Sequence, residues 1–114
     1  DVALTNEGTC LLKGGKKDEA EVVLRKALDR SPNNAEALFQ LASTLYEKAV
    51  YFKARAFMQR FESVGQARPE SLMLGRNIEL RLGNSGAASD YTRRLLQSFP
   101  ESQQARALNA QNQS

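Results

Sequence analysis

Few residues of this sequence could do chemistry on a substrate or hold a metal. Cys10 is the only cysteine, and the sequence contains no histidine. This composition excludes intramolecular disulfides, zinc sites with Cys and His ligands, and catalytic pairs of the Cys-His or Ser-His type. We interpret Cys10 as a small apolar residue inside a helix, because free cysteines are among the most buried residue types.

Two polar stretches have simpler explanations than catalysis. The stretch GGKK at 14–17 lacks the G-x-x-x-x-G-K-[ST] spacing of a phosphate-binding loop, and no strand precedes it, so we interpret it as a turn. The carboxylates of Asp18 and Glu19 stand at an expected helix start, where the helix dipole stabilises them without an acid-base role. The sequence therefore predicts a protein that is not an enzyme, with no cofactor and no metal.

The charge and the length of the chain exclude further kinds of protein. The basic excess is small, with 16 Lys and Arg against 13 Asp and Glu in 114 residues. The basic pairs at 16–17 and 93–94 are isolated among acidic residues, so we expect no nucleic-acid partner. No apolar run approaches the ~20 residues that a membrane-spanning helix needs. One structural unit fits this length.

The sequence repeats itself with a period of 34 residues. Alanine recurs at Ala20, Ala54 and Ala88, and leucine recurs with the same interval at Leu4, Leu38 and Leu72. Within each period the apolar residues follow the spacing of two amphipathic helices. The small residues let two antiparallel helices approach closely where they cross. The period therefore predicts an all-α array of helix pairs.

Turn and cap residues place the helices along the chain. Glycine ends the first helix of a pair at Gly15 and Gly83, whereas Ala49 occupies that position in the second period and predicts a less sharply specified turn. Asn33 or Asn34 can cap the third helix, Pro69 suits a first helical turn, and Ser85 can cap the sixth helix. The expected helices cover 2–13, 17–30, 35–48, 51–64, 69–82 and 85–98, with a short helix near 102–108.

The order of residues in the first period resembles the tetratricopeptide repeat (TPR). The matching residues are Leu4, Gly8, Leu11, Ala20, Leu24, Ala27 and Pro32. The resemblance implies a TPR-like α-solenoid of about three helix-turn-helix repeats plus a short C-terminal helix. We expect one domain at 1–109, with repeats at about 1–34, 35–68 and 69–102, a capping helix to 109, and a frayed polar tail at 110–114. The third repeat departs from the pattern at Gly75, Arg76 and Glu79, and Leu74, Ile78 and Leu82 are the expected substitutes.

Two segments of the C-terminal half carry a narrower resemblance. The segments QARPESLMLGRNIELRLGN and AASDYTRRLLQSFPES are similar to the C-terminal repeats of the type IV pilus biogenesis lipoproteins, also called pilotins. The resemblance implies a protein at the periplasmic face of the outer membrane that assists assembly of the pilus secretin. It also implies a lipid anchor on an upstream cysteine other than Cys10, as the only link to the membrane. Without this resemblance we would expect a cytoplasmic protein.

In a TPR array the first helix of each repeat lines a concave surface that suits an extended or helical peptide. We expect a protein or peptide partner to contact the residues of these helices that face away from the second helices. They are Asn6, Thr9, Lys13, Phe39, Gln40, Ser43, Glu47, Met73, Asn77 and Arg81. An exposed Phe39 ring would mark an interaction patch. Tyr46, Tyr51 and Phe52 are expected to fill the junction between the two helices of the second repeat.

Two other functions remain open at this point. One is a structural TPR module that self-associates: Glu7 and the start at Asp1 suggest a lost upstream repeat, and exposed repeat ends could drive dimerisation. The other is a cytosolic peptide-binding adaptor. Such an adaptor needs several lysines and asparagines around a peptide carboxylate, and Lys13 with Asn6 supplies part of that set.

Overall fold

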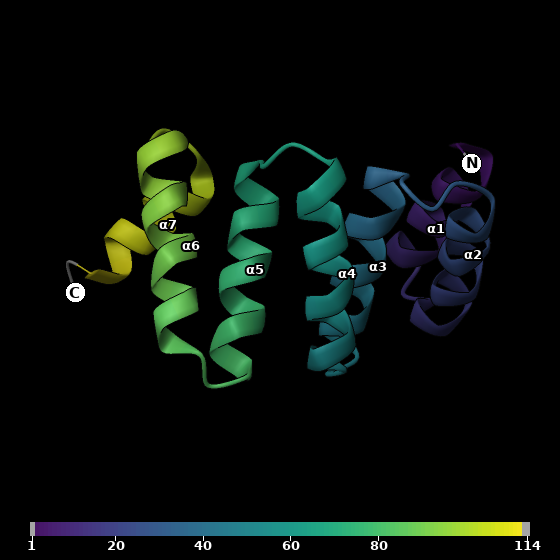
Figure 1. Cartoon of the computed structure of the whole chain (residues 1–114), viewed down its shortest axis with the longest axis horizontal. Helices are drawn as coiled ribbons and strands as arrows, with labels where there is room; N and C mark the ends of the chain where they lie inside the picture. The colour runs from purple at the N-terminus through teal and green to yellow at the C-terminus, as the bar shows by residue number, and fades with distance from the viewer. Residues whose placement is uncertain (1, 113–114) are drawn as a thin grey trace. The chain divides into compact units, whose positions relative to one another are not determined.

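The computed structural model describes residues 2–112, and this part of the chain is all-α (Figure 1). The first six helices begin where the sequence predicts and end at the predicted residue or one residue earlier. The helices are α1 (Val2–Lys13), α2 (Lys17–Arg30), α3 (Ala35–Glu47), α4 (Tyr51–Val64), α5 (Pro69–Arg81), α6 (Ser85–Ser98) and α7 (Gln103–Asn112). None of these helices has the length and apolar character needed to cross a membrane. The all-α fold predicted from the 34-residue period is confirmed.

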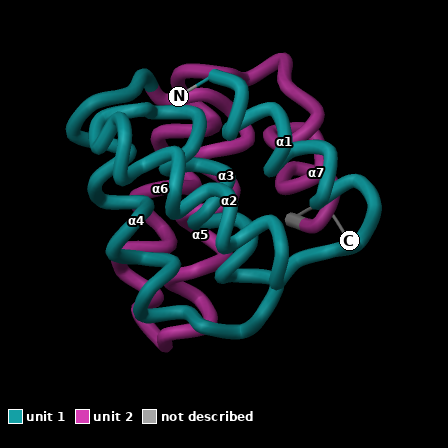
Figure 2. Tube along the Cα trace, turned by 90° about the vertical axis from the view of Figure 1, so that its right-hand side faces the viewer, with its two compact units in different colours: residues 1–66 teal, residues 67–114 magenta. Residues whose placement is uncertain are grey.

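The chain divides into two compact units, residues 1–66 and 67–114 (Figure 2). In the first unit α1 packs against α2 and α3 packs against α4, while α3 also contacts α1 and α2. In the second unit α5 pairs with α6, and α7 packs against both. The three helix pairs coincide with the predicted repeats, whereas their grouping into one domain at 1–109 stays a prediction. Helix α7 continues through residues 110–112, where we expected fraying, and residues 113–114 lie outside the described part.

Small residues make the close helix crossings of the first unit possible. A Cβ atom at Gly8 would lie 2.7 Å from Leu24 Cδ2, so the leucine of α2 occupies the space that a larger residue on α1 would need. Ala20 and Ala54 are both 0% exposed. The largest fully buried side chains of this unit are Leu24, Leu38, Leu41, Leu45, Met58 and Thr44. Each expected crossing therefore has a small residue on one helix and large apolar residues around it.

In the second unit a different pair of residues, Gly75 and Tyr91, allows the two helices to approach closely. A Cβ atom at Gly75 would lie 2.5 Å from the Tyr91 ring, so the glycine makes room for an aromatic side chain of α6. Leu74 and Ile78 are buried, as expected for substitutes of the missing repeat residues, and Leu82 is half-buried. A core of Leu72, Leu95, Ala105 and Leu108 joins α7 to the α5–α6 pair.

The three turns inside the helix pairs have the same geometry. Gly15, Ala49 and Gly83 adopt positive φ angles of 78°, 63° and 79°. In each turn the following residue's N–H reaches back five residues, as Val50 N–H does to the Leu45 carbonyl at 2.9 Å. This is the pattern of a Schellman helix end. The expectation of a looser turn at Ala49 was wrong, because these hydrogen bonds hold the alanine in the left-handed region.

Three other expectations about single residues also need correction. Ser85 is the first residue of α6 rather than its cap, and the side chain of the capping residue Asn84 donates to Glu79 Oε1 at 2.8 Å instead. Cys10 is exposed, because it lies two residues from the buried Gly8 and thus about 200° around α1. Phe52 is 72% exposed for the same reason, two residues from the buried Ala54. Only Tyr46 and Tyr51 meet at the α3–α4 junction, with ring centroids 5.6 Å apart.

The strained turn at Ala49 predicts a stabilising substitution. A left-handed alanine costs about 1–2 kcal/mol, and glycine removes this cost while adding about 0.4–1 kcal/mol of unfolded-state entropy. We expect Ala49→Gly to raise the free energy of unfolding by up to about 1 kcal/mol in chemical denaturation followed by circular dichroism. The matched control is Gly83→Ala, which should lower it by a similar amount. A destabilised Ala49→Gly variant would contradict this account of the turn.

The helix crossing at Ala54 predicts a destabilising substitution. Ala54 is completely buried where α4 packs, so Ala54→Leu forces three more carbon atoms into a filled space and should cost about 1–3 kcal/mol. A thermal scan should show a clearly lower melting temperature. Ala56→Leu, at an exposed position of the same helix, serves as the control and should leave the melting temperature nearly unchanged. Equal melting temperatures for the two variants would disprove the crossing.

Candidate functional site

The first candidate site is a stripe of polar side chains on the first helices of unit 1, which we call the inner surface. Residues three or four positions apart share one face of a helix. The inner surface consists of Asn6, Thr9 and Lys13 on α1 together with Gln40, Ser43 and Glu47 on α3. The structure thus brings together six of the ten residues that the sequence suggested as partner contacts.

Polar side chains join α1 to α3 at the inner surface. Thr9 Oγ1 donates to Gln40 Oε1 at 2.8 Å, and Gln40 Nε2 donates to Glu36 Oε1 at 3.0 Å. Further along the helices, Asn34 Nδ2 donates to Thr5 Oγ1 at 3.0 Å. The same Asn34 caps α3, because its Oδ1 accepts from the Ala37 N–H at 3.1 Å. These bonds fix the distance between the two helices that carry the site.

The other side chains of the inner surface keep their hydrogen-bonding capacity for a partner. The side chains of Asn6, Lys13, Ser43 and Glu47 make no hydrogen bond or ion pair with the rest of residues 2–112. Together they offer an amide, an ammonium group, a hydroxyl and a carboxylate. Such a set can bond to the backbone and charged groups of a peptide.

Phe39 does not form the exposed aromatic patch that the sequence suggested. Its side chain is half-buried, and its ring centroid lies 5.7 Å from that of the buried Phe61, with the rings tilted by 49°. The ring therefore packs between α3 and α4 and has a structural role. Its part in partner binding stays a prediction. The most exposed aromatic ring of the described residues is that of Phe52, next to Arg55.

The remaining three candidates lie on α5 in the second unit. Met73 is half-buried and packs against the core formed with α7. Asn77 Oδ1 accepts a hydrogen bond from Arg76 Nη1 at 2.9 Å. Arg81 is exposed at the end of the helix. Their expected contact with a partner stays a prediction.

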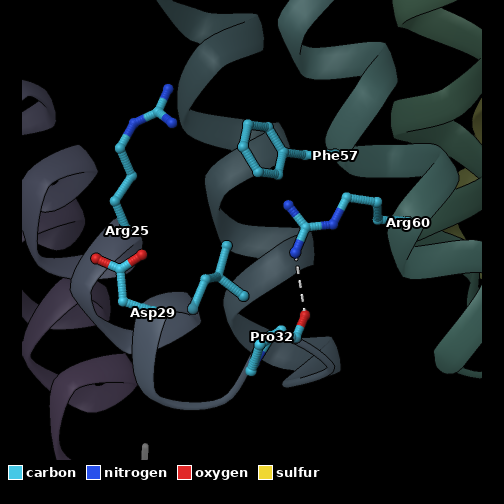
Figure 3. A pocket seen from close by; sticks show the side chains of 6 residues that line it. Arg25, Asp29, Pro32, Phe57 and Arg60 are labelled. Atoms are coloured by element: carbon cyan, nitrogen blue, oxygen red, sulfur yellow. Dashed lines mark hydrogen bonds between the residues drawn. The ribbon is translucent and has the colours of Figure 1, made fainter.

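A second candidate site, which was not predicted from the sequence, lies between the second helices, α2 and α4. A pocket of about 440 Å³ is lined by Arg25, Leu28, Asp29, Pro32, Phe57 and Arg60 (Figure 3). We call it the α2–α4 pocket. Of these residues only Pro32 was singled out from the sequence, as the last residue of the repeat pattern. Because arginines on helices usually face solvent, only the fold shows that two of them meet at one aromatic ring.

An ion-pair network connects the α3–α4 turn to this pocket. Lys48 Nζ lies 2.7 Å from both Asp18 Oδ1 and Glu21 Oε1, and Glu21 Oε2 lies 3.1 Å from Arg25 Nε. The hydrogen bonds from Lys48 lower the pKa of both carboxyl groups, and for Glu21 burial opposes part of that shift. The hydrogen bonds to Asp18 and Glu21 raise the pKa of Lys48. The network thereby holds Arg25 in place.

The lowered carboxyl pKa values predict acid-sensitive stability. A carboxyl group with a folded pKa below its unfolded value stabilises the fold above the unfolded pKa and loses this effect as the pH falls. Removing the ammonium group in Lys48→Met should therefore lower the melting temperature at pH 7. The gap to the unmodified protein should close as the pH falls below about 4.5, the ordinary pKa of a glutamate.

The control for this experiment is Lys53→Met, because Lys53 is exposed and makes no ion pair with the described residues. It should leave the pH dependence of the melting temperature unchanged. If the gap between Lys48→Met and the unmodified protein stays constant from pH 7 to pH 3, the network does not stabilise the fold.

Comparisons with known proteins agree with this geometry. The family model of the tetratricopeptide repeat matches residues 3–34. No curated protein matches the chain significantly. PilF of Pseudomonas aeruginosa superposes with a TM-score of 0.84 and 24% identity over 95% of this chain. PilW, a widely conserved type IV pilus biogenesis factor, gives a TM-score of 0.83 and 30% identity over 94% of this chain.

The chain spans about half the length of these two pilus proteins, 49% in each case. A third similar structure is the first TPR of Spaghetti (RPAP3) bound to the HSP90 peptide SRMEEVD. It has a TM-score of 0.84 and 19% identity, and the match covers 99% of this chain and 93% of that one. The TPR fold is a scaffold for protein interactions. The chain therefore contains a tetratricopeptide repeat and has the TPR fold, and it resembles the type IV pilus biogenesis proteins PilF and PilW.

Proposed function

We propose that this chain is a non-enzymatic part of the type IV pilus assembly machinery and binds a protein partner on its inner surface. The observation that carries the proposal is the set of inner-surface side chains without a bond inside the described chain, namely those of Asn6, Lys13, Ser43 and Glu47. They stand on two helices whose distance is fixed by the Thr9–Gln40 hydrogen bond. A preorganised surface binds with less loss of conformational entropy than a flexible one.

The pilus role rests on the likeness to PilF and PilW over nearly the whole of this chain. We propose the pilus secretin as the partner and the periplasmic face of the outer membrane as the location. An upstream lipid anchor would hold the protein there. A helical module that binds an exposed segment of the secretin would assist its assembly.

A peptide-binding adaptor outside the pilus system is the second candidate. It is favoured by the similarity to the RPAP3 domain, which is bound to an acidic peptide. In that case Lys13 would meet a carboxylate of the ligand, with Asn6 bonding to the peptide beside it. Self-association through repeat ends also stays a prediction, and the exposed side chains of Val2 and Val22 provide apolar surface for it. Light scattering over a concentration range measures this directly.

The proposed pilus function predicts the effect of a double substitution on the inner surface. Lys13→Ala combined with Ser43→Ala removes two polar groups that make no side-chain hydrogen bond or ion pair with the described residues, so the fold should be unchanged. We expect affinity for the purified secretin of the same organism to fall about 5- to 30-fold, as measured by surface plasmon resonance, because two polar contacts of roughly 1 kcal/mol each are lost. In cells the same variant should show fewer assembled secretin multimers.

The matched control is Lys26→Ala combined with Ser89→Ala, two exposed positions on the second helices α2 and α6. This variant should bind the secretin as the unmodified protein does. If the secretin does not bind the unmodified protein but the peptide SRMEEVD does, and its binding requires Lys13, the adaptor is the correct reading. Secretin binding that survives the inner-surface substitutions would move the contact to another surface.

A further inference from the structure

The α2–α4 pocket has two arginine side chains held beside one aromatic ring. The guanidinium carbon of Arg25 lies 5.4 Å from the centroid of the Phe57 ring, and that of Arg60 lies 5.3 Å from it. Figure 3 shows Arg25 and Asp29 on one side of the space and Phe57 and Arg60 on the other, with Pro32 below them. Two cations at one ring repel each other, so each must be held by other contacts.

Each arginine is fixed by a partner outside the ring. Arg60 Nη2 donates to the Pro32 carbonyl at 3.2 Å. Arg25 Nε donates to Glu21 Oε2 at 3.1 Å, and Glu21 is itself held by Lys48. A guanidinium group has five N–H donors in a rigid fork. Because each of these two bonds uses one donor, both groups keep most of their capacity to bind a carboxylate.

The wall of the pocket between the two cations is apolar. It consists of the Phe57 ring, Leu28 and Pro32, and Leu28 is already buried among its neighbours. A volume of about 440 Å³ admits a few side chains. The pocket therefore fits a ligand that has an apolar group flanked by negative charge.

The charges around the pocket favour a peptide over other anionic ligands. Helix α4 carries three basic residues, Lys53, Arg55 and Arg60, and a single acidic one, Glu62. This excess of positive charge attracts an acidic segment. The carboxylate of Asp29 lines the same pocket and makes no hydrogen bond or ion pair with the described residues. It can accept a backbone N–H of a peptide, a donor that the phosphate backbone of a nucleic acid lacks.

We propose that the α2–α4 pocket is a second docking site, which takes an acidic peptide segment with an apolar residue between two acidic ones. In an extended peptide, residues i and i+2 point to the same side, roughly 7 Å apart. An apolar side chain can thus fill the wall at Phe57 while the acidic residues two positions before and after it reach Arg25 and Arg60. This site lies on the second helices, so it is separate from the inner surface and does not depend on the pilus proposal.

The test uses the whole chain, labelled with nitrogen-15, and a capped synthetic peptide of sequence Ser-Glu-Ser-Leu-Ser-Glu-Ser. We expect the peptide to shift the amide resonances of Leu28, Phe57 and Arg60 in an NMR titration. Replacing both glutamates of the peptide by glutamine should weaken binding about tenfold or more, because it removes the charge but keeps the shape. Arg60→Gln should weaken binding by a similar factor, since the residue is exposed and its loss leaves the core intact.

Two further variants keep the test specific. Arg93→Gln removes an exposed arginine that is bonded to Asp90 on α6, and it should leave peptide binding unchanged. Lys13→Ala should also have no effect. The proposal is wrong if the peptide causes no shifts, if its binding requires Lys13 rather than Arg60, or if the glutamine peptide binds equally well. Shifts at Phe57 caused by a short single-stranded oligonucleotide in place of the peptide would likewise overturn it.

Discussion

The close contact between the two helices of each repeat is the constraint on which the rest of the structure depends. In the first repeat Leu24 of α2 occupies the space beside Gly8, and the buried Ala20 lies one helical turn away on the same helix. In the third repeat the Tyr91 ring covers Gly75 in the same manner. Because the paired helices approach this closely, one face of each helix is buried against its partner. The opposite faces are then available as two different surfaces, one formed by the first helices and one by the second.

The contact between repeats is of a different kind and carries the functional geometry of unit 1. Apolar packing brings α3 against α1 and α2, but the register of α1 and α3 is set by polar side chains. Asn34 makes both its cap bond to Ala37 and its bond to Thr5, so the start of α3 and its position beside α1 are determined by one residue. A buried polar bond with a defined partner specifies position more sharply than apolar contact does. The inner surface therefore has a fixed width.

Most of the fold could be predicted from the sequence, because the 34-residue period, the small residues and the glycines act locally. The boundaries of the six long helices follow from these signals. The predictions were wrong where helical spacing did not decide whether a residue faces the core or the solvent. They were also wrong where tertiary contacts override the backbone preference of a residue. Ala49 takes the left-handed angle that its neighbours impose, and Phe52 is apolar by type yet points to solvent. Six of the ten suggested contacts form one surface, whereas the α2–α4 pocket joins residues from two repeats and has no signature in either one.

The turn that breaks the glycine pattern also explains how the two surfaces of unit 1 are connected. Lys48 stands at the C-terminal end of α3, one residue before the left-handed Ala49, and the turn places its ammonium group against Asp18 and Glu21 of α2. Through Glu21 this contact positions Arg25 at the α2–α4 pocket. Helix α3 thus presents Gln40, Ser43 and Glu47 on the inner surface, and the residue after its end helps to order Arg25 at the α2–α4 pocket. A turn held by backbone hydrogen bonds, even at the cost of a strained alanine, is therefore what keeps the pocket in register with the repeat.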